Sequence, residues 1–333
     1  MGMEFSFIVP VYNRPDEVAE LLESMACLDY ERSFEVVIVE DGSGISSEEV
    51  VKRYSGKLSI SYFYKENTGP GDSRNYGMQK ASGNYFLILD SDCILPPHYL
   101  SEVHRELAEN FVHCFGGPDT AHLSFSPLQK AINYAMTSTL TTGGIRGKKN
   151  AVGKFQPRSF NMGISREAFL RTGGFGKIHP GEDPDLTIRL WAAGYETRFF
   201  ERAYVYHKRR ISWKKFYTQV YKFGMTRPIL NRWHPQTEKP VYWLPAFFLA
   251  GFLFSLLMCL AGNIFFIKLY LIYFIVIFFD SWYSSGGIKI ALMSVFAVLV
   301  QFSGYGYGFI KSTFYIKILK KVPERVFPEL FFE

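Results

Sequence analysis

The chain has 333 residues, of which 20% are charged and 48% hydrophobic, and its formal net charge is +6. This length allows two modest domains, or one domain with appended segments. The four cysteines show neither a C-x-x-C spacing nor the density of a disulfide scaffold, which excludes that class and suits a reducing compartment.

Apolar segments of strand length alternate with amphipathic helical patterns in the first ninety residues. We expect strands at residues 5–9, 34–39, 58–64 and 85–89, and helices at residues 16–27, 46–54 and 71–81. This alternation predicts an α/β domain with a doubly wound, largely parallel sheet. Ligands of such sheets lie beyond the carboxyl ends of the strands, where residues 12–14, 40–43 and 90–92 form three polar clusters.

The pattern becomes mixed after Pro96. We expect a helix at 98–110, strands at 112–116 and 158–164, a short helix at 166–172, and a mobile Gly/Thr-rich loop at 137–153. A helix at 184–193 carries acidic residues near its start. The segment 212–225 is a basic, aromatic, amphipathic helix that either lies in the headgroup layer of a membrane or packs on the soluble domain.

The last third of the chain is strongly apolar. Lys268 is the only charged residue from 241 to 279, and Lys289 the only one from 288 to 310. These stretches predict membrane segments at 242–260, 264–279 and 288–310. Three crossings would place the basic tail outside, although its lysines prefer the cytosol, so one segment is expected to be re-entrant or interfacial. The glycines at 304, 306 and 308 point to the last one.

A basic stretch precedes the first apolar segment, with eleven Lys/Arg and three Glu between Glu196 and Lys239. The positive-inside rule and anionic headgroups explain it better than nucleic-acid binding, which we do not expect. The start of the chain has no pattern of a signal peptide or a myristoylation site, so the amino-terminal part is expected in the cytosol.

Five motifs in order carry a resemblance to a known family. They are residues 9–14 (VPVYNR), 39–43 (VEDGS), 67–75 (NTGPGDSRN), 90–92 (DSD) and 181–186 (GEDPDL). Together they make residues 4–225 similar to family 2 glycosyltransferases of the GT-A fold. Each motif taken singly is also explained by ordinary structure, such as a polar turn that closes a strand.

The resemblance implies a site for a nucleotide-sugar donor, UDP- or GDP-linked. Tyr12 would offer an aromatic face to the base, Asp41 an acceptor to the base, and Asp90 a carboxylate near the ribose. Arg74 would face the donor phosphate or sugar. The other donor-binding residues that it implies are Pro10, Asn13, Arg14, Asn67, Ser91 and Asn161.

Two carboxylates at i and i+2 at the end of a buried strand can coordinate one hard divalent cation. Asp92, with Asp90, is the predicted ligand of Mg²⁺ or Mn²⁺, and the resemblance adds His207. Asp183 resembles the general base of inverting transferases, and Glu182 beside it would bind the acceptor or raise the pKa of Asp183 by like-charge proximity. A helix-capping role is the alternative for this acidic pair.

Together these features predict a metal-dependent, inverting glycosyltransferase in the plasma or inner membrane, with a cytosolic catalytic domain. We expect a GT-A domain at 1–225, a basic linker at 226–240, a membrane region at 241–310 and a basic tail at 311–333. The element Gln-x-x-Arg-Trp of processive synthases is missing, because Ile229 stands at the glutamine position before Arg232. The acceptor is expected to be a polyprenyl-diphosphate-linked glycan of the cell envelope, with polyprenyl phosphate or a glycolipid as alternatives. A catalytically silent membrane scaffold is the competing interpretation.

Overall fold

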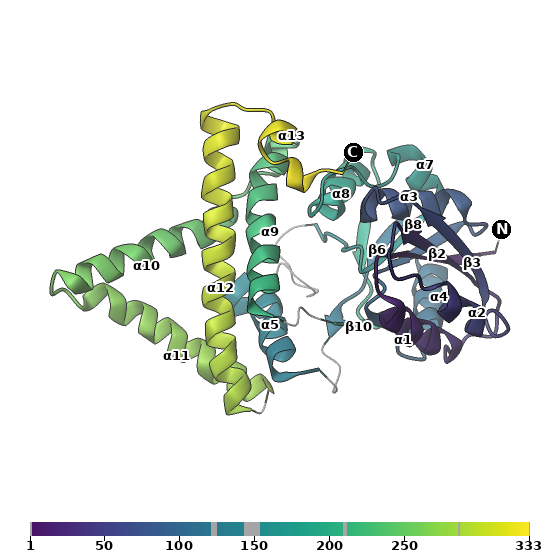
Figure 1. Ribbon diagram of the computed structural model, residues 1–333, viewed down its shortest axis with the longest axis horizontal. Helices are drawn as coiled ribbons and strands as arrows, with labels where there is room; N and C mark the ends of the chain where they lie inside the picture. The colour runs from purple at the N-terminus through teal and green to yellow at the C-terminus, as the bar shows by residue number, and fades with distance from the viewer. Residues whose placement is uncertain (1, 121–124, 143–153, 209–211, 286, 333) are drawn as a thin grey trace. The chain divides into compact units, whose positions relative to one another are not determined.

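The computed structural model of the protein describes residues 2–120, 125–142, 154–208, 212–285 and 287–332 (Figure 1). The chain divides into two compact units. The sheet unit comprises Met1–His122, Gly147–Lys208 and Phe331–Glu333, and the helical unit comprises Leu123–Arg146 and Arg209–Leu330. The domain boundaries expected at residues 225, 240 and 310 stay predictions.

A seven-stranded sheet forms the centre of the sheet unit, in the order β3-β2-β1-β4-β8-β6-β9. Its strands are β1 (Phe5–Val11), β2 (Glu35–Asp41), β3 (Ser59–Lys65), β4 (Tyr85–Leu89), β6 (Cys114–Gly116), β8 (Asn161–Ser165) and β9 (Thr197–Phe199). The first four strands pair in parallel, and β8 runs antiparallel to β4 and β6. The predicted doubly wound, largely parallel α/β sheet is confirmed.

Helices cover both faces of this sheet. One face packs on α1 (Pro15–Ala26), α2 (Glu48–Tyr54) and α4 (Tyr99–Glu109), and the other on α3 (Pro70–Lys80), α7 (Arg166–Thr172) and α8 (Glu182–Ala192). Alternate residues of β1 supply the two cores: Phe7 and Val9 point to the first, and Ile8 points to the second. Burial on both faces explains why these strands are apolar runs without polar alternation.

A second, three-stranded sheet in the order β5-β10-β7 stands beyond the carboxyl end of β4. It contains β5 (Cys93–Ile94), β7 (Asp119–Thr120) and β10 (Val205–His207). His207 pairs with Cys93 across β10 and β5, and Val205 pairs with Asp119 across β10 and β7. This small sheet brings three segments that are far apart in sequence to the end of the central sheet.

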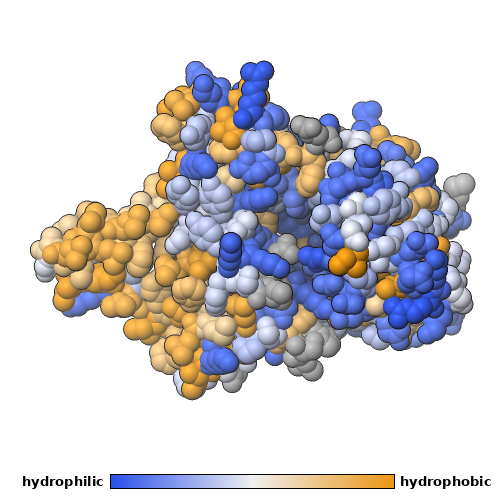
Figure 2. All heavy atoms as spheres, in the orientation of Figure 1, coloured by the Kyte–Doolittle hydropathy of each residue, from blue (hydrophilic) through white to orange (hydrophobic). Residues whose placement is uncertain are grey.

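The helical unit contains α5 (Pro127–Thr137), α6 (Thr139–Thr142), α9 (Trp213–Trp233), α10 (Leu244–Leu260), α11 (Phe265–Ser285), α12 (Ile288–Thr313) and α13 (Pro323–Val326). Short helical turns lie at Pro235–Thr237, Pro240–Trp243, Phe314–Ile318 and Pro328–Leu330. Among the described residues, three helical stretches are long and apolar enough to cross a membrane: Pro240–Leu260, Phe265–Ser285 and Ile288–Ile318. The face of the α10–α11 hairpin seen in Figure 2 is mostly hydrophobic.

Several elements differ from the sequence predictions. The helix expected at 212–225 continues through Pro228 to Trp233, and it buries Phe216 and Val220 against α5 and α12. Of the loop expected at 137–153, residues 139–142 form α6, and residues 143–153 lie outside the described residues. The three glycines of α12 lie within an unbroken helix, and the expected re-entrant or interfacial placement of this segment stays a prediction.

Candidate functional site

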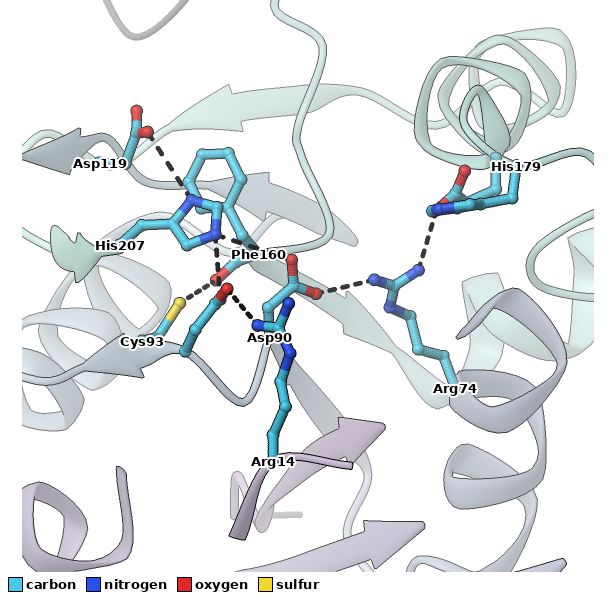
Figure 3. A network of polar contacts seen from close by, with 10 residues as sticks. Arg14, Arg74, Asp90, Cys93, Asp119, Phe160, His179 and His207 are labelled. Carbon is cyan, nitrogen blue, oxygen red and sulfur yellow. Dashed lines mark hydrogen bonds and ion pairs between the residues drawn. The ribbon is translucent and has the colours of Figure 1, made fainter. Parts of the chain in front are cut away.

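Asp90 directly follows β4, and Asp92 lies two residues further on. Asp90 faces Arg74 (Figure 3), whereas Asp92 faces Arg14. The Oδ2 atom of Asp92 lies 2.5 Å from a guanidinium nitrogen of Arg14. Its Oδ1 atom lies 3.1 Å from Nε2 of His207, and Oδ2 of Asp90 lies 3.9 Å from the same nitrogen. The predicted pair of carboxylates and the predicted histidine are therefore neighbours.

His207 is held in place from several sides. Its backbone belongs to β10, and its ring stacks on Phe160 with ring centroids 4.8 Å apart. Its Nδ1 atom lies 3.9 Å from Oδ2 of the buried Asp119. At this distance the contact is an ion pair and not a hydrogen bond, so Asp119 favours a proton on Nδ1 through its charge. The Nε2 atom points to Asp92 and Asp90.

The charges of this cluster suit a hard divalent cation. Burial alone would raise the pKa of Asp92, but His207 and Arg14 lower it well below its usual range, so the carboxylate is ionised. The Sγ atom of Cys93 lies near Asp92 and His207, but burial raises the pKa of this thiol far above its ordinary value. A protonated thiol is a poor ligand. The residues present therefore fit Mg²⁺ or Mn²⁺ through Asp92, Asp90 and His207.

Arg74 connects Asp90, near the candidate metal ligands, with Glu182 of the acidic pair at the start of α8. Its guanidinium lies 2.8 Å from Oδ1 of Asp90 and 3.1 Å from Oε1 of Glu182, and the residue is 3% exposed. The ring of Phe175 lies against the guanidinium, 5.3 Å from its carbon. The helix α3 begins at Pro70, after Gly69 with its positive φ of 91°, and this start directs Arg74 inward. A solvent-exposed surface ion pair is thereby excluded for Arg74.

The two acids at the start of α8 have opposite electrostatic environments. Burial would raise the pKa of Glu182, but His179 and Arg74 lower it to about 2. The Nδ1 atom of His179 lies 2.9 Å from Oε1 of Glu182. Burial, and then the charge of Glu182, raise the pKa of Asp183 to about 6. One permanently ionised acid therefore stands beside one that exchanges its proton near neutral pH.

The other predicted donor residues form the loops above the sheet. Tyr12 is 53% exposed, so its ring is available to a ligand. Asn13 accepts a hydrogen bond from the amide of Ile45 and donates its own amide to Ser43. Asp41 accepts hydrogen bonds from Lys65 and from two backbone amides, and Asn67 is exposed.

Three residues that were predicted to bind the donor are buried or half-buried within the domain. Pro10 is half-buried in β1, and Ser91 is buried between the two aspartates. Asn161 is completely buried: its Oδ1 accepts a hydrogen bond from Tyr99, and its Nδ2 donates to the carbonyls of Ala203 and Pro118. Because its polar atoms are used inside the domain, this geometry does not support a contact between Asn161 and a donor sugar.

Sequence reasoning missed His179, Asp119 and Phe160, which orient the site without belonging to its motifs. His179 stands three residues before Glu182, at the spacing of one helical turn, which is a signal that the sequence does carry. The carboxyl-terminal residues were missed too. Phe332 donates its amide to the carbonyl of Lys177, and its ring packs on Gly69 and lies 6.0 Å from the ring of His179.

The sheet unit has the GT-A fold, with acidic residues and a histidine beyond the carboxyl ends of a largely parallel sheet. Residues 6–171 match the family model described as Glycosyl transferase family 2. The chain therefore carries a family 2 glycosyltransferase domain, as its motifs indicate.

Individual relatives are similar over part of the chain. Poly(ribitol-phosphate) beta-N-acetylglucosaminyltransferase TarS of Staphylococcus aureus is 40% identical over 93 residues, which are 27% of this chain and 16% of that protein. A glycosyltransferase of Haemophilus influenzae, named as uncharacterized, is 29% identical over 56% of this chain and 61% of its own length. The mannosyltransferase PcManGT from Pyrobaculum calidifontis, solved with GDP-Man and Mn²⁺, shares the fold with a TM-score of 0.61 and 16% identity, covering 90% of this chain and 87% of that chain.

Proposed function

We propose that the protein is a metal-dependent, inverting glycosyltransferase that moves one sugar from a UDP- or GDP-linked donor to an acceptor at the membrane. The acidic pair of α8 carries this proposal. Asp183 has a pKa of about 6, so it is largely deprotonated at neutral pH and still basic enough to take a proton. A helix-capping acid has no need of such a pKa, because exposure and the helix dipole would lower it.

The donor would lie between Tyr12 and the cluster of Asp90, Asp92 and His207. The exposed ring of Tyr12 would stack on the base. A divalent cation held by Asp92, Asp90 and His207 would neutralise the diphosphate and favour its departure. Asp119 and Phe160 would keep the imidazole of His207 aimed at the same point.

In the transfer step, an acceptor hydroxyl oxygen attacks the anomeric carbon of the sugar. Asp183 takes the proton of that hydroxyl as the new C–O bond forms. The bond between the anomeric carbon and the diphosphate oxygen breaks, and its electron pair leaves with the nucleoside diphosphate. Attack from the opposite face inverts the anomeric centre. Glu182 remains charged throughout, because His179 and Arg74 hold its carboxylate.

The acceptor is proposed to be a polyprenyl-diphosphate-linked glycan of the cell envelope. The apolar stretches Pro240–Leu260, Phe265–Ser285 and Ile288–Ile318 support membrane residence. A glycan on a polyprenyl carrier presents a neutral hydroxyl, and such a hydroxyl needs the base that Asp183 supplies. The sheet unit is proposed to be cytosolic, in agreement with the basic residues before the first apolar helix.

The topology that we propose has two full crossings, made by α10 and α11. Phe331 and Phe332 belong to the same unit as the amino-terminal sheet, which favours an even number of crossings. The helix α12 runs beside α9 in the same direction (Figure 1). The exposed Lys214, Lys215 and Arg232 on α9 make hydrocarbon a poor surrounding for this pair. The α9–α12 pair is therefore assigned to the membrane interface.

The test is donor hydrolysis and sugar transfer by the full chain in membranes, with mass analysis of lipid-linked products across a set of nucleotide sugars. We expect turnover that needs Mn²⁺ or Mg²⁺ and is lost in Asp92→Ala. A chain that hydrolyses no nucleotide sugar, with or without metal, would be the silent scaffold. Substantial transfer by Asp183→Asn would indicate polyprenyl phosphate as acceptor, because that nucleophile is already anionic and needs no base.

A further inference from the structure

The helices α9 and α12 pack closely because glycines face their partner's backbone. A Cβ atom on Gly308 would lie 2.3 Å from the carbonyl oxygen of Tyr221, and one on Gly224 would lie 2.1 Å from that of Tyr305. Tyr217 and Val220 face Gly304 in the same way. Residue numbers rise together along both helices, so the next turn brings residues 227–231 of α9 to the level of residues 312–313 of α12.

At this turn the interface changes from apolar to polar. Arg227 is 8% exposed, Asn231 3%, Ser312 0% and Thr313 9%. Four of their polar atoms are buried without a hydrogen-bond partner among the described residues: Nη1 of Arg227, Oδ1 of Asn231, Oγ of Ser312 and Oγ1 of Thr313. Buried polar atoms are nearly always paired, so four such atoms at one level indicate a missing partner.

For Arg227 and the two hydroxyls the missing partner is an anion, whereas Oδ1 of Asn231 is an acceptor that an anion does not satisfy. A buried guanidinium without a counter-charge is strongly unfavourable. In the described part of the chain, no carboxylate forms an ion pair with Arg227, and its recorded contact is with the ring of Tyr242, 4.2 Å from its carbon. The acid Glu238, which precedes Tyr242 by four residues, is paired with Lys317. The protein thus supplies the cation and the hydroxyl donors, but not the negative charge.

The position of the cluster indicates where this anion comes from. Tyr242 belongs to the turn Pro240–Trp243, which leads directly into the apolar helix α10. The neighbouring Trp243 packs on Phe309 of α12, with ring centroids 4.8 Å apart. Tyrosine and tryptophan beside the start of an apolar helix mark the headgroup level of a bilayer. The anions available at that level are the phosphates of lipids.

We propose that Arg227, Ser312 and Thr313 form a binding site for the phosphate group of the polyprenyl carrier. The planar guanidinium binds phosphate oxygens in a bidentate manner, and the two hydroxyls donate to further oxygens. This inference rests on the proposed function, since it names the part of the acceptor that the helical unit holds. The same chemistry would accept an anionic phospholipid, so the experiment includes that source as a separate arm.

The full chain is placed in nanodiscs of neutral phosphatidylcholine, with EDTA and without nucleotide sugar. Undecaprenyl phosphate, undecaprenyl diphosphate or phosphatidylglycerol is added, and retained lipid is counted by native mass spectrometry. We expect one polyprenyl lipid per chain, with affinity lower by about 10-fold or more in Arg227→Gln. Arg232→Gln is the matched control. Arg232 is exposed and donates to the carbonyl of Lys321, so its variant should bind as the wild type does.

Equal retention of the polyprenyl lipid by Arg227→Gln and the wild type would overturn the proposal. Preference for phosphatidylglycerol, with the same dependence on Arg227, would overturn the assignment to the carrier. If Arg227→Gln does not fold, Arg227→Lys and Ser312→Ala take its place, and weaker binding by both is expected. Donor hydrolysis that depends on Asp92 needs no lipid, so failure of this site is distinguishable from failure of the proposed function.

Discussion

Replacing Asp183 by asparagine removes the proposed base while its shape is kept. A positioned base contributes about 10²- to 10⁴-fold, so we expect the transfer rate to fall by this factor. The pH dependence has a definite sign. Asp183 acts as a base only when deprotonated, so wild-type activity should rise through pH 6 and level off above it. At pH 5 a group with a pKa of about 6 is about one-tenth deprotonated, which predicts about one-tenth of the plateau rate.

Glu182→Gln tests the origin of this pKa. Because the charge of Glu182 raises the pKa of Asp183, its removal should move the midpoint to lower pH. Asp185→Asn is the control, since Asp185 lies in the same helical turn but pairs with Arg189. The assay measures kcat from about pH 4.5 to about pH 8, with saturating donor and acceptor. A flat profile in the wild type, or an unchanged midpoint in Glu182→Gln, would refute the reasoning.

Three further predictions concern the metal ligands and the helix pair. Asp92→Ala should lose Mn²⁺ binding, which is measured by electron paramagnetic resonance without donor; unchanged binding would contradict the ligand assignment. Asp119→Asn should weaken Mn²⁺ binding by about 10- to 100-fold, because Asp119 orients His207, and the same titration measures it. Gly308→Ala should lower the thermal unfolding midpoint, since its Cβ would meet the carbonyl of Tyr221, and circular dichroism in detergent measures that midpoint.

The sequence predicts the sheet unit well because burial on two faces leaves a clear signal. The four strands from Phe5 to Leu89 and their helices were expected within a few residues, and the family motifs lie at strand ends as expected. The sequence could not predict the ion pairs Arg14–Asp92 and Arg74–Glu182, because the partners lie 78 and 108 residues apart. Such ion pairs depend on how distant segments of the chain pack together, and no local sequence pattern predicts that packing.

The helical unit shows a different limit of sequence reasoning. The glycines of α12 pointed to a re-entrant or interfacial segment, and glycine also weakens an isolated helix. In the structure Gly304 and Gly308 let α9 approach, and Gly306 lies against Pro245 and Ala246 of α10. Gains from close packing outweigh the loss of helix propensity. A glycine pattern alone therefore does not show which helix packs against it.

Arg74 explains how the donor and base halves of the site keep their spacing. One guanidinium contacts Asp90 on the donor side and Glu182 beside the base, so the distance between the halves is set by a rigid planar group. A lysine would supply the charge but only a single point of contact. Arg74 acts on both acids of α8. After His179 it stabilises the charge on Glu182, which opposes ionisation of Asp183, and its own charge lowers the pKa of Asp183. Geometry and proton affinity of the proposed base thus depend on one buried arginine.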